Sequence, residues 1–493
     1  MVNRQGHIDI IANRMTKSFG DGTLGLQVVK QALALDRTQL EGLLGREEQN
    51  SAIEQDLSTL VSLQSHWQEL NGETNGAGLI RKDEHIHAYA RRRVHDDLDL
   101  MYTRFNPHIF ALTAFFAGWK YRHITRKIQV MEEEPGTLKT LRRLSHSAPL
   151  ITSSDHQSNL DQVVLGWALY MNRIPMPLFQ AGINLALGKT RRKLPALGAY
   201  FIDKGRLGTL DGGRPDLLYI RTRSEMRKHM WDMNINQHHY SQAGRSYTGE
   251  FPGQHYLTGK EMIDVSLISD AMAFQKETGK KVWVGMISLA NSLVAEGESL
   301  YAHALEKKSV PSTDMMAEWA QTSAHLGDYG RKELPITLYV HRPRLLDELA
   351  KESDHPQSSR DVTRHILEEI GRHRTVLPVP LLSLAVETYR EQMEGISGNQ
   401  HPSYATLRTV FTDLRNALGK HHAVLHSSLS AQEHVAPAKI DDAFFSALLT
   451  HEKLGSLQIV STCYDKSRLY WHVRPTDSYI LPFMANTLRH LKR

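Results

Sequence analysis

Residues Ser153–Trp167 read SSDHQSNLDQVVLGW, a polar turn followed by an apolar helix. A short apolar strand is predicted just before it at Ala148–Thr152, and the helix is predicted over Asn159–Tyr170. His156 and Asp161 are five residues apart and straddle this strand-to-helix turn. With the histidine in the turn and the aspartate in the first helical turn, we expect the two side chains to meet.

A histidine beside a carboxylate is suited to proton transfer. Imidazole has a pKa near neutrality and can take the proton of an attacking hydroxyl, while the carboxylate fixes its tautomer and steadies the imidazolium. The same stretch is also compatible with a capping box, with Ser158 as the N-cap residue, Asp161 at N3 and His156 as a passive loop residue. The spacing leaves both interpretations open.

The sequence around this stretch alternates between strand and helix patterns. Further strands are predicted at Ala199–Ile202, Val282–Leu289 and Ile336–Val340, with a helix at Asp264–Gln275 between two of them. This alternation predicts an α/β layer architecture. Three consecutive segments are expected: a helical N-terminal region (1–130), an αβ domain (131–350) and a mainly helical C-terminal domain (351–493).

An apolar run of twelve residues, His108–Trp119, is followed by basic residues up to Lys127. A bilayer span needs about 20 residues, so this run is too short to cross a membrane. Residues 108–127 are predicted either to lie in a membrane interface, with the basic side chains on head groups, or to form a buried core helix. No secretory signal peptide is predicted at the chain start.

Composition excludes several classes of protein. The 493 residues contain one cysteine, Cys463, which rules out an internal disulfide and a zinc site built on several cysteines. The net charge of +5 suits anionic partners, and no nucleic-acid-binding motif is found. The pairs His238-His239 and His421-His422 lack metal-ligand spacing and are predicted to be surface residues.

Two glycine-containing segments with basic residues follow the helix, at Leu197–Arg206 (LGAYFIDKGR) and Tyr240–Gly249 (YSQAGRSYTG). Guanidinium groups bind phosphate in a forked geometry, and glycine permits close backbone approach. The candidate phosphate-binding residues are Lys204, Arg206, Gly244, Arg245 and Ser246.

These motifs, in this order, resemble the glycerolipid acyltransferase family, and within it the bacterial-type glycerol-3-phosphate acyltransferases. The family's H-x4-D block is matched by His156 and Asp161, and its EGGRSRTG block by Gln242–Gly249. Other matching segments are Ala181–Leu185, Gly198–Lys204, Val282–Leu289, Leu338–Pro343, Leu377–Val386 and Tyr470–Leu491. The resemblance covers roughly residues 95–493.

The resemblance implies an αβ acyltransferase core, with a mixed sheet flanked by helices and with helical N- and C-terminal regions. It implies that His156 is the general base, that Asp161 orients it, and that Arg245, Ser246 and Lys204 bind the acceptor phosphate. Glycerol 3-phosphate is the implied acceptor, and acyl-CoA or acyl carrier protein the donor, with no metal or prosthetic group. Peripheral or monotopic association with anionic lipids at the cytoplasmic face of a membrane is expected.

The chain departs from the family pattern at four positions, all outside the proton-transfer pair. Gln242 stands where the family has an acid, Asp203 and Tyr247 where it usually has arginine, and Gly285 near the usual proline. The changes alter the predicted acceptor pocket. Dihydroxyacetone phosphate or a lysophospholipid is therefore an alternative acceptor, although the HLKR ending is not a peroxisomal S-K-L address. A non-catalytic membrane-bound scaffold is the alternative from another class.

Overall fold

The computed structural model describes residues 4–20, 84–114, 128–158, 161–186, 190–207, 215–255, 259–294, 296–306, 335–394, 401–421, 423–430, 437–465, 468–476 and 478–492. The chain divides into two compact units, and each is described by itself. Unit 1 comprises Met1–Phe110 and Leu178–Ile235, and unit 2 comprises Ala111–Pro177 and Asn236–Arg493. This division differs from the three consecutive segments expected, because residues 178–235 group with the N-terminal helices and residues 351–493 group with the sheet of unit 2.

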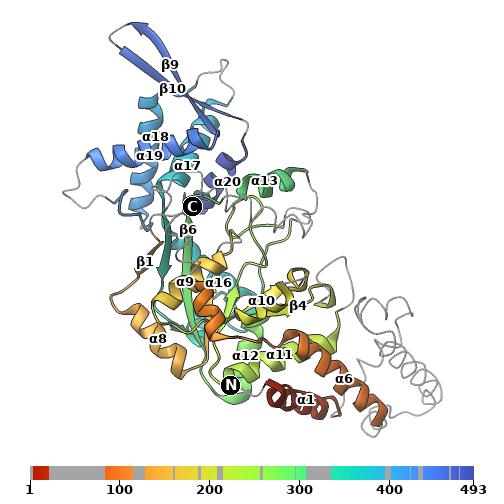
Figure 1. Ribbon diagram of the computed structural model, residues 1–493. Coiled ribbons are helices and arrows are strands. Elements are labelled where there is room, and N and C mark those ends of the chain that lie inside the picture. Colours follow the sequence, from red (N-terminus) through yellow and green to blue (C-terminus); the bar gives the residue numbers. More distant parts are fainter. Residues whose placement is uncertain are drawn as a thin grey trace. The chain divides into compact units, whose positions relative to one another are not determined.

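Unit 2 is built on a mixed sheet (Figure 1). Its strand order is β1-β7-β6-β2-β5, with β8 paired to β6. β2 runs parallel to β5 and β6, whereas β7 and β8 run antiparallel to β6. The segments that follow β2 and β5 therefore leave the same edge of the sheet. The strands are β1 (Ile128–Glu132), β2 (Leu150–Ser154), β5 (Gln237–Tyr240), β6 (Trp283–Asn291), β7 (Ile336–Val340) and β8 (Arg344–Leu345).

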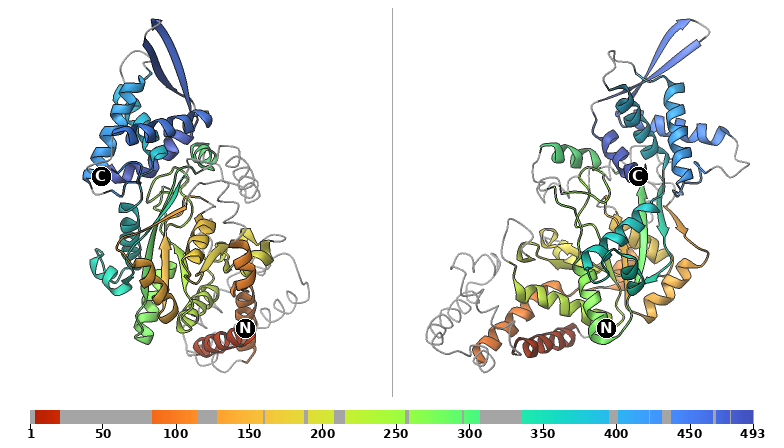
Figure 2. Two further views of the ribbon diagram at one scale, coloured as in Figure 1. Left: turned by 60° about the vertical axis from the view of Figure 1, so that its left-hand side comes forward. Right: turned by 180° about the vertical axis from the view of Figure 1, so that it is seen from behind.

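Helices cover both faces of this sheet (Figure 2). On β6, a Cβ added to Gly285 would lie 2.6 Å from the side chain of Leu141 in α8, whereas Ser288 donates a hydrogen bond to the carbonyl of Ile370 in α16. Residues three apart on a strand point to opposite faces, so α8 and α16 lie on different sides. The helices around this sheet are α8 (Thr137–Ser147), α9 (Asp161–Met171), α12 (Ser266–Thr278), α15 (Leu346–Glu352) and α16 (Ser359–Arg372).

The C-terminal part of unit 2 is mainly helical and shares the hydrophobic core of the sheet. Leu150 and Leu338 from strands belong to one buried cluster with Leu382 of α17 and Leu481 of α20. An antiparallel hairpin, β9–β10, adds a strand pair that the sequence did not predict. The elements are α13 (Gly297–Glu306), α17 (Pro378–Met393), α18 (Tyr404–Lys420), α19 (Pro437–Lys453), β9 (Leu457–Asp465), β10 (Arg468–Pro475), α20 (Ile480–Arg489) and η3 (His490–Lys492).

Among the residues that the structure describes, unit 1 packs helices against the parallel strand pair β3–β4. Its core includes Ile11 of α1, Leu98 of α6, Ile202 of β4 and Met230 of α11. The elements are α1 (Arg4–Gly20), α6 (Glu84–Met101), β3 (Leu178–Gly182), η1 (Ile183–Leu185), α10 (Thr190–Ala196), β4 (Ala199–Ile202), η2 (Gly205–Leu207) and α11 (Leu217–Asp232).

The predicted α/β class, with a mixed sheet flanked by helices, is confirmed. Of the predicted interfacial segment 108–127, residues up to 114 are helical and residues 115–127 lie outside the described part of the chain. Residues 21–83 of the predicted helical N-terminal region (1–130) lie outside the described part too. None of the helices that the structure describes has the length and apolar character needed to cross a bilayer.

Candidate active site

His156 and Asp161 lie at the junction between β2 and α9. His156 Nδ1 is 3.3 Å from Asp161 Oδ2, so the structure brings the two side chains together. The Asp161 carboxylate is buried, whereas the His156 side chain keeps 20% of its surface exposed. The imidazole stacks on Tyr240 with ring centroids 4.1 Å apart. With Nδ1 facing the carboxylate, Nε2 is the nitrogen left to exchange a proton with a substrate.

The Asp161 carboxylate also holds the loop that carries His156. Its Oδ2 accepts hydrogen bonds from the backbone N–H groups of Gln157 (2.6 Å) and Ser158 (2.7 Å). Its Oδ1 accepts from Asn291 Nδ2 at the end of β6 (3.1 Å). The bond from the Ser158 N–H to Asp161 is one half of the predicted capping box, whereas the Ser158 hydroxyl bonds to Glu296 and not to the Asp161 N–H.

The loop after β5 lies against the loop after β2. The Ser246 N–H donates to the carbonyl oxygen of His156 over 3.3 Å. The Ser246 hydroxyl donates to the carbonyl of Glu250, over 2.9 Å. Arg245 is buried, with Nη1 3.7 Å from Glu296 Oε1, and this same oxygen accepts from the Ser158 hydroxyl over 2.9 Å. Glu296 thus bridges the two loops.

Two glycines of this loop differ in how strictly they are required. A Cβ on Gly244 would lie 3.2 Å from the flexible end of Met262. Gly249 has a φ of +81°, and its Cβ would lie 2.1 Å from the backbone oxygen of Phe483 in α20. An added side chain would therefore clash more severely at Gly249 than at Gly244.

Lys204 and Arg206 belong to unit 1, near the end of β4. Lys204 is exposed. Arg206 is buried, and its guanidinium donates to the carboxylates of Asp97 and Asp216. It also lies over the Tyr219 ring, and burial raises the pKa of that phenol to about 12. Because two carboxylates already engage Arg206, we assign it to the core of unit 1.

The prediction that His238 and His239 are surface residues is wrong. Both are buried, because the residues of β5 up to His239 lie within the covered sheet. His238 contacts the hydroxyls of Thr152 (3.0 Å) and Ser154 (3.3 Å), and burial lowers its pKa to about 3. Hydroxyl partners from β2 let a polar ring lie in the interior without a charge. His421 is exposed, as expected.

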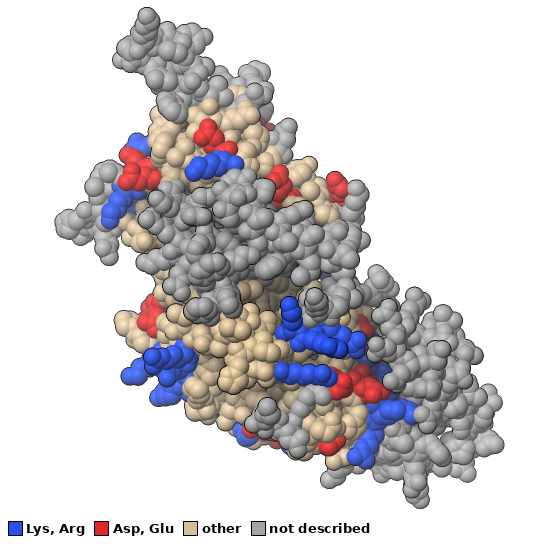
Figure 3. Space-filling model, viewed as in Figure 1, with Lys and Arg blue, Asp and Glu red and all other residues tan. Residues whose placement is uncertain are grey.

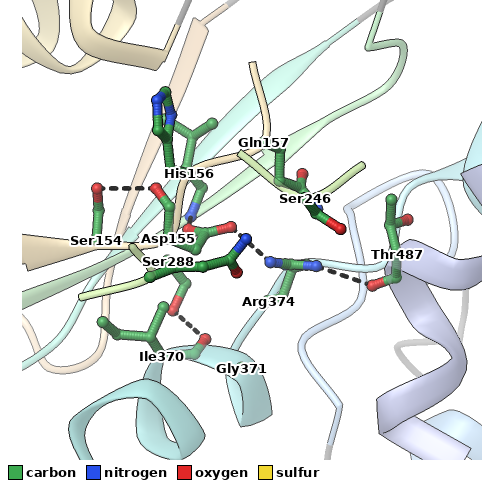
Figure 4. A network of polar contacts seen from close by, with 12 residues as sticks. Ser154, Asp155, His156, Gln157, Ser246, Ser288, Ile370, Gly371, Arg374 and Thr487 are labelled. Carbon is green, nitrogen blue, oxygen red and sulfur yellow. Dashed lines mark hydrogen bonds and ion pairs between the residues drawn. The ribbon is translucent and has the colours of Figure 1, made fainter. Parts of the chain in front are cut away.

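Sequence reasoning missed the residues that anchor the His156 loop from distant segments (Figure 4). Asp155 forms a buried ion pair with Arg374, 219 positions away along the chain. Glu296 and Asn291 reach the loop from the segment around the end of β6. Asp155 stands directly before His156, but nothing in the sequence identifies its partner at such a separation.

Comparison with known proteins shows a partial similarity. No family model matches the chain. A stretch of 152 residues, 31% of the chain, is 25% identical to the bovine protein glycerol-3-phosphate acyltransferase 1, mitochondrial, and spans 18% of that relative's length. The chain is distantly similar to a glycerolipid acyltransferase. This similarity supports an enzyme of the acyltransferase type and leaves the substrate to the proposal below.

Proposed function

We propose that the protein transfers a fatty acyl group from an acyl thioester to the sn-1 hydroxyl of glycerol 3-phosphate, giving lysophosphatidate for phospholipid synthesis. The observation that carries the proposal is the contact between His156 Nδ1 and the buried Asp161 carboxylate. The similarity to the bovine enzyme, whose name contains this acceptor, supports it.

The proposed reaction begins with proton transfer. Nε2 of His156 takes the proton of the acceptor hydroxyl while that oxygen attacks the thioester carbonyl carbon. Asp161 accepts the Nδ1–H bond and stabilises the imidazolium that forms. The tetrahedral intermediate then expels the thiolate, which receives the proton from His156. An ester and a free thiol result, and the proposed reaction uses no metal or prosthetic group.

Arg245 is the proposed anchor for the acceptor phosphate. Its loop is joined to the His156 loop through the Ser246 N–H. A phosphate held there would keep the hydroxyl of the same molecule near His156, and such positioning supplies a large part of a rate enhancement. Lys204 lies in unit 1 and stays a sequence-based prediction of a phosphate ligand.

A thiol-release assay tests the function. Purified protein with detergent is mixed with palmitoyl-CoA and glycerol 3-phosphate, and free thiol is followed for the wild type and for His156→Ala. His355→Ala is the matched control, because His355 pairs with Asp361 at 3.0 Å on an exposed surface. We expect release that needs both glycerol 3-phosphate and His156, and is unchanged in His355→Ala.

Other outcomes of this assay separate the alternatives. Release that requires His156 but prefers dihydroxyacetone phosphate or a lysophospholipid would keep the mechanism and replace the acceptor. Release with acyl carrier protein thioesters in place of palmitoyl-CoA would change the donor. The wild type could also release thiol no faster than His156→Ala with every donor and acceptor. This result would contradict the proposed acyltransferase activity and favour a membrane-bound scaffold.

We also propose that the protein binds the cytoplasmic face of an anionic membrane as a peripheral or monotopic protein. In unit 1, Phe105 and Ile109 are 37% and 45% exposed. The segment just before Phe105 is hydrogen-bonded to α10, because Thr103 Oγ1 donates to the Pro195 carbonyl over 2.8 Å. Figure 3 shows lysine and arginine side chains over the part of unit 1 where Figure 1 labels α10. Exposed residues of this helix are Arg191, Arg192 and Lys193. Apolar side chains beside basic ones are typical of interfacial binding.

A further inference from the structure

The guanidinium of Arg374 joins three segments of unit 2 around the His156 loop (Figure 4). Arg374 follows α16, and its Nη2 donates to Asp155 Oδ2 over 2.6 Å. Its Nη1 donates to the carbonyl of Thr487 in α20 over 3.0 Å. Its Cζ lies 4.4 Å from the ring centroid of Phe251, in the segment after Ser246. The Arg374 side chain therefore contacts the His156 loop, the segment after Ser246 and α20.

Asp155 is held on its other side by the sheet. Its Oδ1 accepts a hydrogen bond from the backbone N–H of Leu289 in β6 over 3.0 Å. The side chain of the residue directly before His156 is thus held between β6 and Arg374. The side chains of Asp155 and Arg374 are 0% and 1% exposed.

A buried ion pair contributes little to the stability of a fold. The mutual attraction of the two charges is largely offset by the cost of removing both from water, and a well-packed hydrophobic pair of similar volume often stabilises a fold as much or more. The pair does, however, fix direction, because two charged groups with several hydrogen bonds have one good geometry. Its place beside His156 makes that geometry matter for the proposed proton transfer.

We propose that Asp155 and Arg374 are positioning residues for His156, and that the C-terminal helical segments complete the active site through Arg374. The inference rests on the proposed function. His156 must lie within hydrogen-bond reach of the substrate hydroxyl while it contacts Asp161, and a displacement of about 1 Å can cost about a hundredfold in rate.

The first test separates positioning from general destabilisation. Arg374→Met is expected to lower kcat by about tenfold to a hundredfold, with a smaller change in KM for glycerol 3-phosphate. The matched control is Arg415→Met, which removes another buried arginine of unit 2, one that donates to the Leu429 carbonyl. A loss of kcat in Arg415→Met as large as in Arg374→Met would overturn the proposal.

A double variant removes the charge imbalance. Asp155→Asn/Arg374→Met leaves neither a buried cation nor a buried anion, so its melting temperature is expected to exceed that of Asp155→Asn, which retains an uncompensated guanidinium. If the pair positions His156, kcat stays low in the double variant. If the double variant recovers both the wild-type kcat and the wild-type stability, the ion pair is purely structural and the proposal is overturned.

A third readout does not depend on activity. The Nδ1–H proton of His156, assigned by its absence in His156→Ala, is followed by proton NMR in the full-length protein. We expect its hydrogen-bonded, downfield resonance to be lost or shifted in Arg374→Met and retained in Arg415→Met. An unchanged resonance in Arg374→Met would overturn the proposal. If the wild type transfers no acyl group, the proposed function fails, while this spectrum still decides whether Arg374 positions His156.

Discussion

The backbone N–H of Ser246 donates a hydrogen bond to the carbonyl oxygen of His156 over 3.3 Å. This bond ties the loop of the proposed base to the loop of the proposed phosphate anchor. It uses the backbone of Ser246, and the hydroxyl of the same residue bonds to Glu250. The side chains of Arg245 and Ser246 are therefore expected to differ in their effect on acceptor binding.

Arg245→Ala is expected to raise KM for glycerol 3-phosphate by about tenfold to a hundredfold, because a charge-assisted hydrogen bond to phosphate is lost. Ser246→Ala keeps the N–H that binds His156 and loses the hydroxyl bond to Glu250. Its KM is expected to change much less. Steady-state kinetics with varied glycerol 3-phosphate checks both variants. A larger effect of Ser246→Ala than of Arg245→Ala would remove Arg245 as the anchor.

Asp161→Asn is expected to lower kcat by roughly 10³–10⁴-fold. An amide oxygen at this position can still accept the N–H groups of Gln157 and Ser158, so the loop is retained. It cannot stabilise an imidazolium or select the correct tautomer as a carboxylate does. Thiol release measures kcat, and circular dichroism melting shows that the fold persists. A kcat within a few-fold of the wild type would contradict the role of Asp161.

The fold class and the contact between His156 and Asp161 could be predicted from sequence because both are local. The apolar strands and helices carry their own periodicity, and His156 and Asp161 are held by one turn. The alternation of strand and helix patterns likewise predicted β4 (Ala199–Ile202) and β7 (Ile336–Val340) at the bounds that the structure shows.

The rest of the site depends on contacts between distant segments. Arg206 has the appearance of a phosphate ligand in sequence, but its two carboxylate partners are revealed only by packing. His238 looked like a surface residue because its hydroxyl partners lie on β2, more than eighty positions earlier. Polar residues in the core are satisfied by such pairs, and periodicity does not encode them.

Acid is expected to destabilise the protein through its buried histidines. Burial lowers the pKa of His451 to about 4, against about 6.5 in an unfolded chain. Below pH 6.5 the unfolded chain binds a proton that the folded chain does not, so stability falls as pH falls, by about 1.4 kcal/mol per unit for this group until pH 4. In His451→Gln, the slope of the unfolding free energy against pH is expected to decrease by the contribution of one proton, about 1.4 kcal/mol per pH unit. An unchanged slope, equal to that of the surface variant His355→Gln, would contradict this.

Membrane binding is expected to depend on α10. Replacing Arg191, Arg192 and Lys193 by alanine should weaken binding to vesicles of phosphatidylcholine mixed with phosphatidylglycerol by roughly fivefold per charge. The control replaces the same number of exposed basic residues on α8, Lys139, Arg142 and Arg143. Co-sedimentation measures both. Equal losses in the two variants would show that net charge decides binding, and binding to pure phosphatidylcholine that equals the mixed vesicles would exclude an electrostatic role.

Gly249→Ala is expected to lower the free energy of unfolding by about 2–5 kcal/mol, because it combines left-handed backbone strain with overpacking. The new methyl group would lie 2.1 Å from the Phe483 carbonyl oxygen, and a backbone atom cannot move aside as a side chain can. Gly279→Ala isolates the strain, since Gly279 has a φ of +71° with nothing within 4 Å of an added Cβ. It should cost about 1–2 kcal/mol. Urea unfolding compares the two variants. Equal losses would mean that α20 does not pack against this loop in solution, and Arg374 would then lack its Thr487 partner at the same helix.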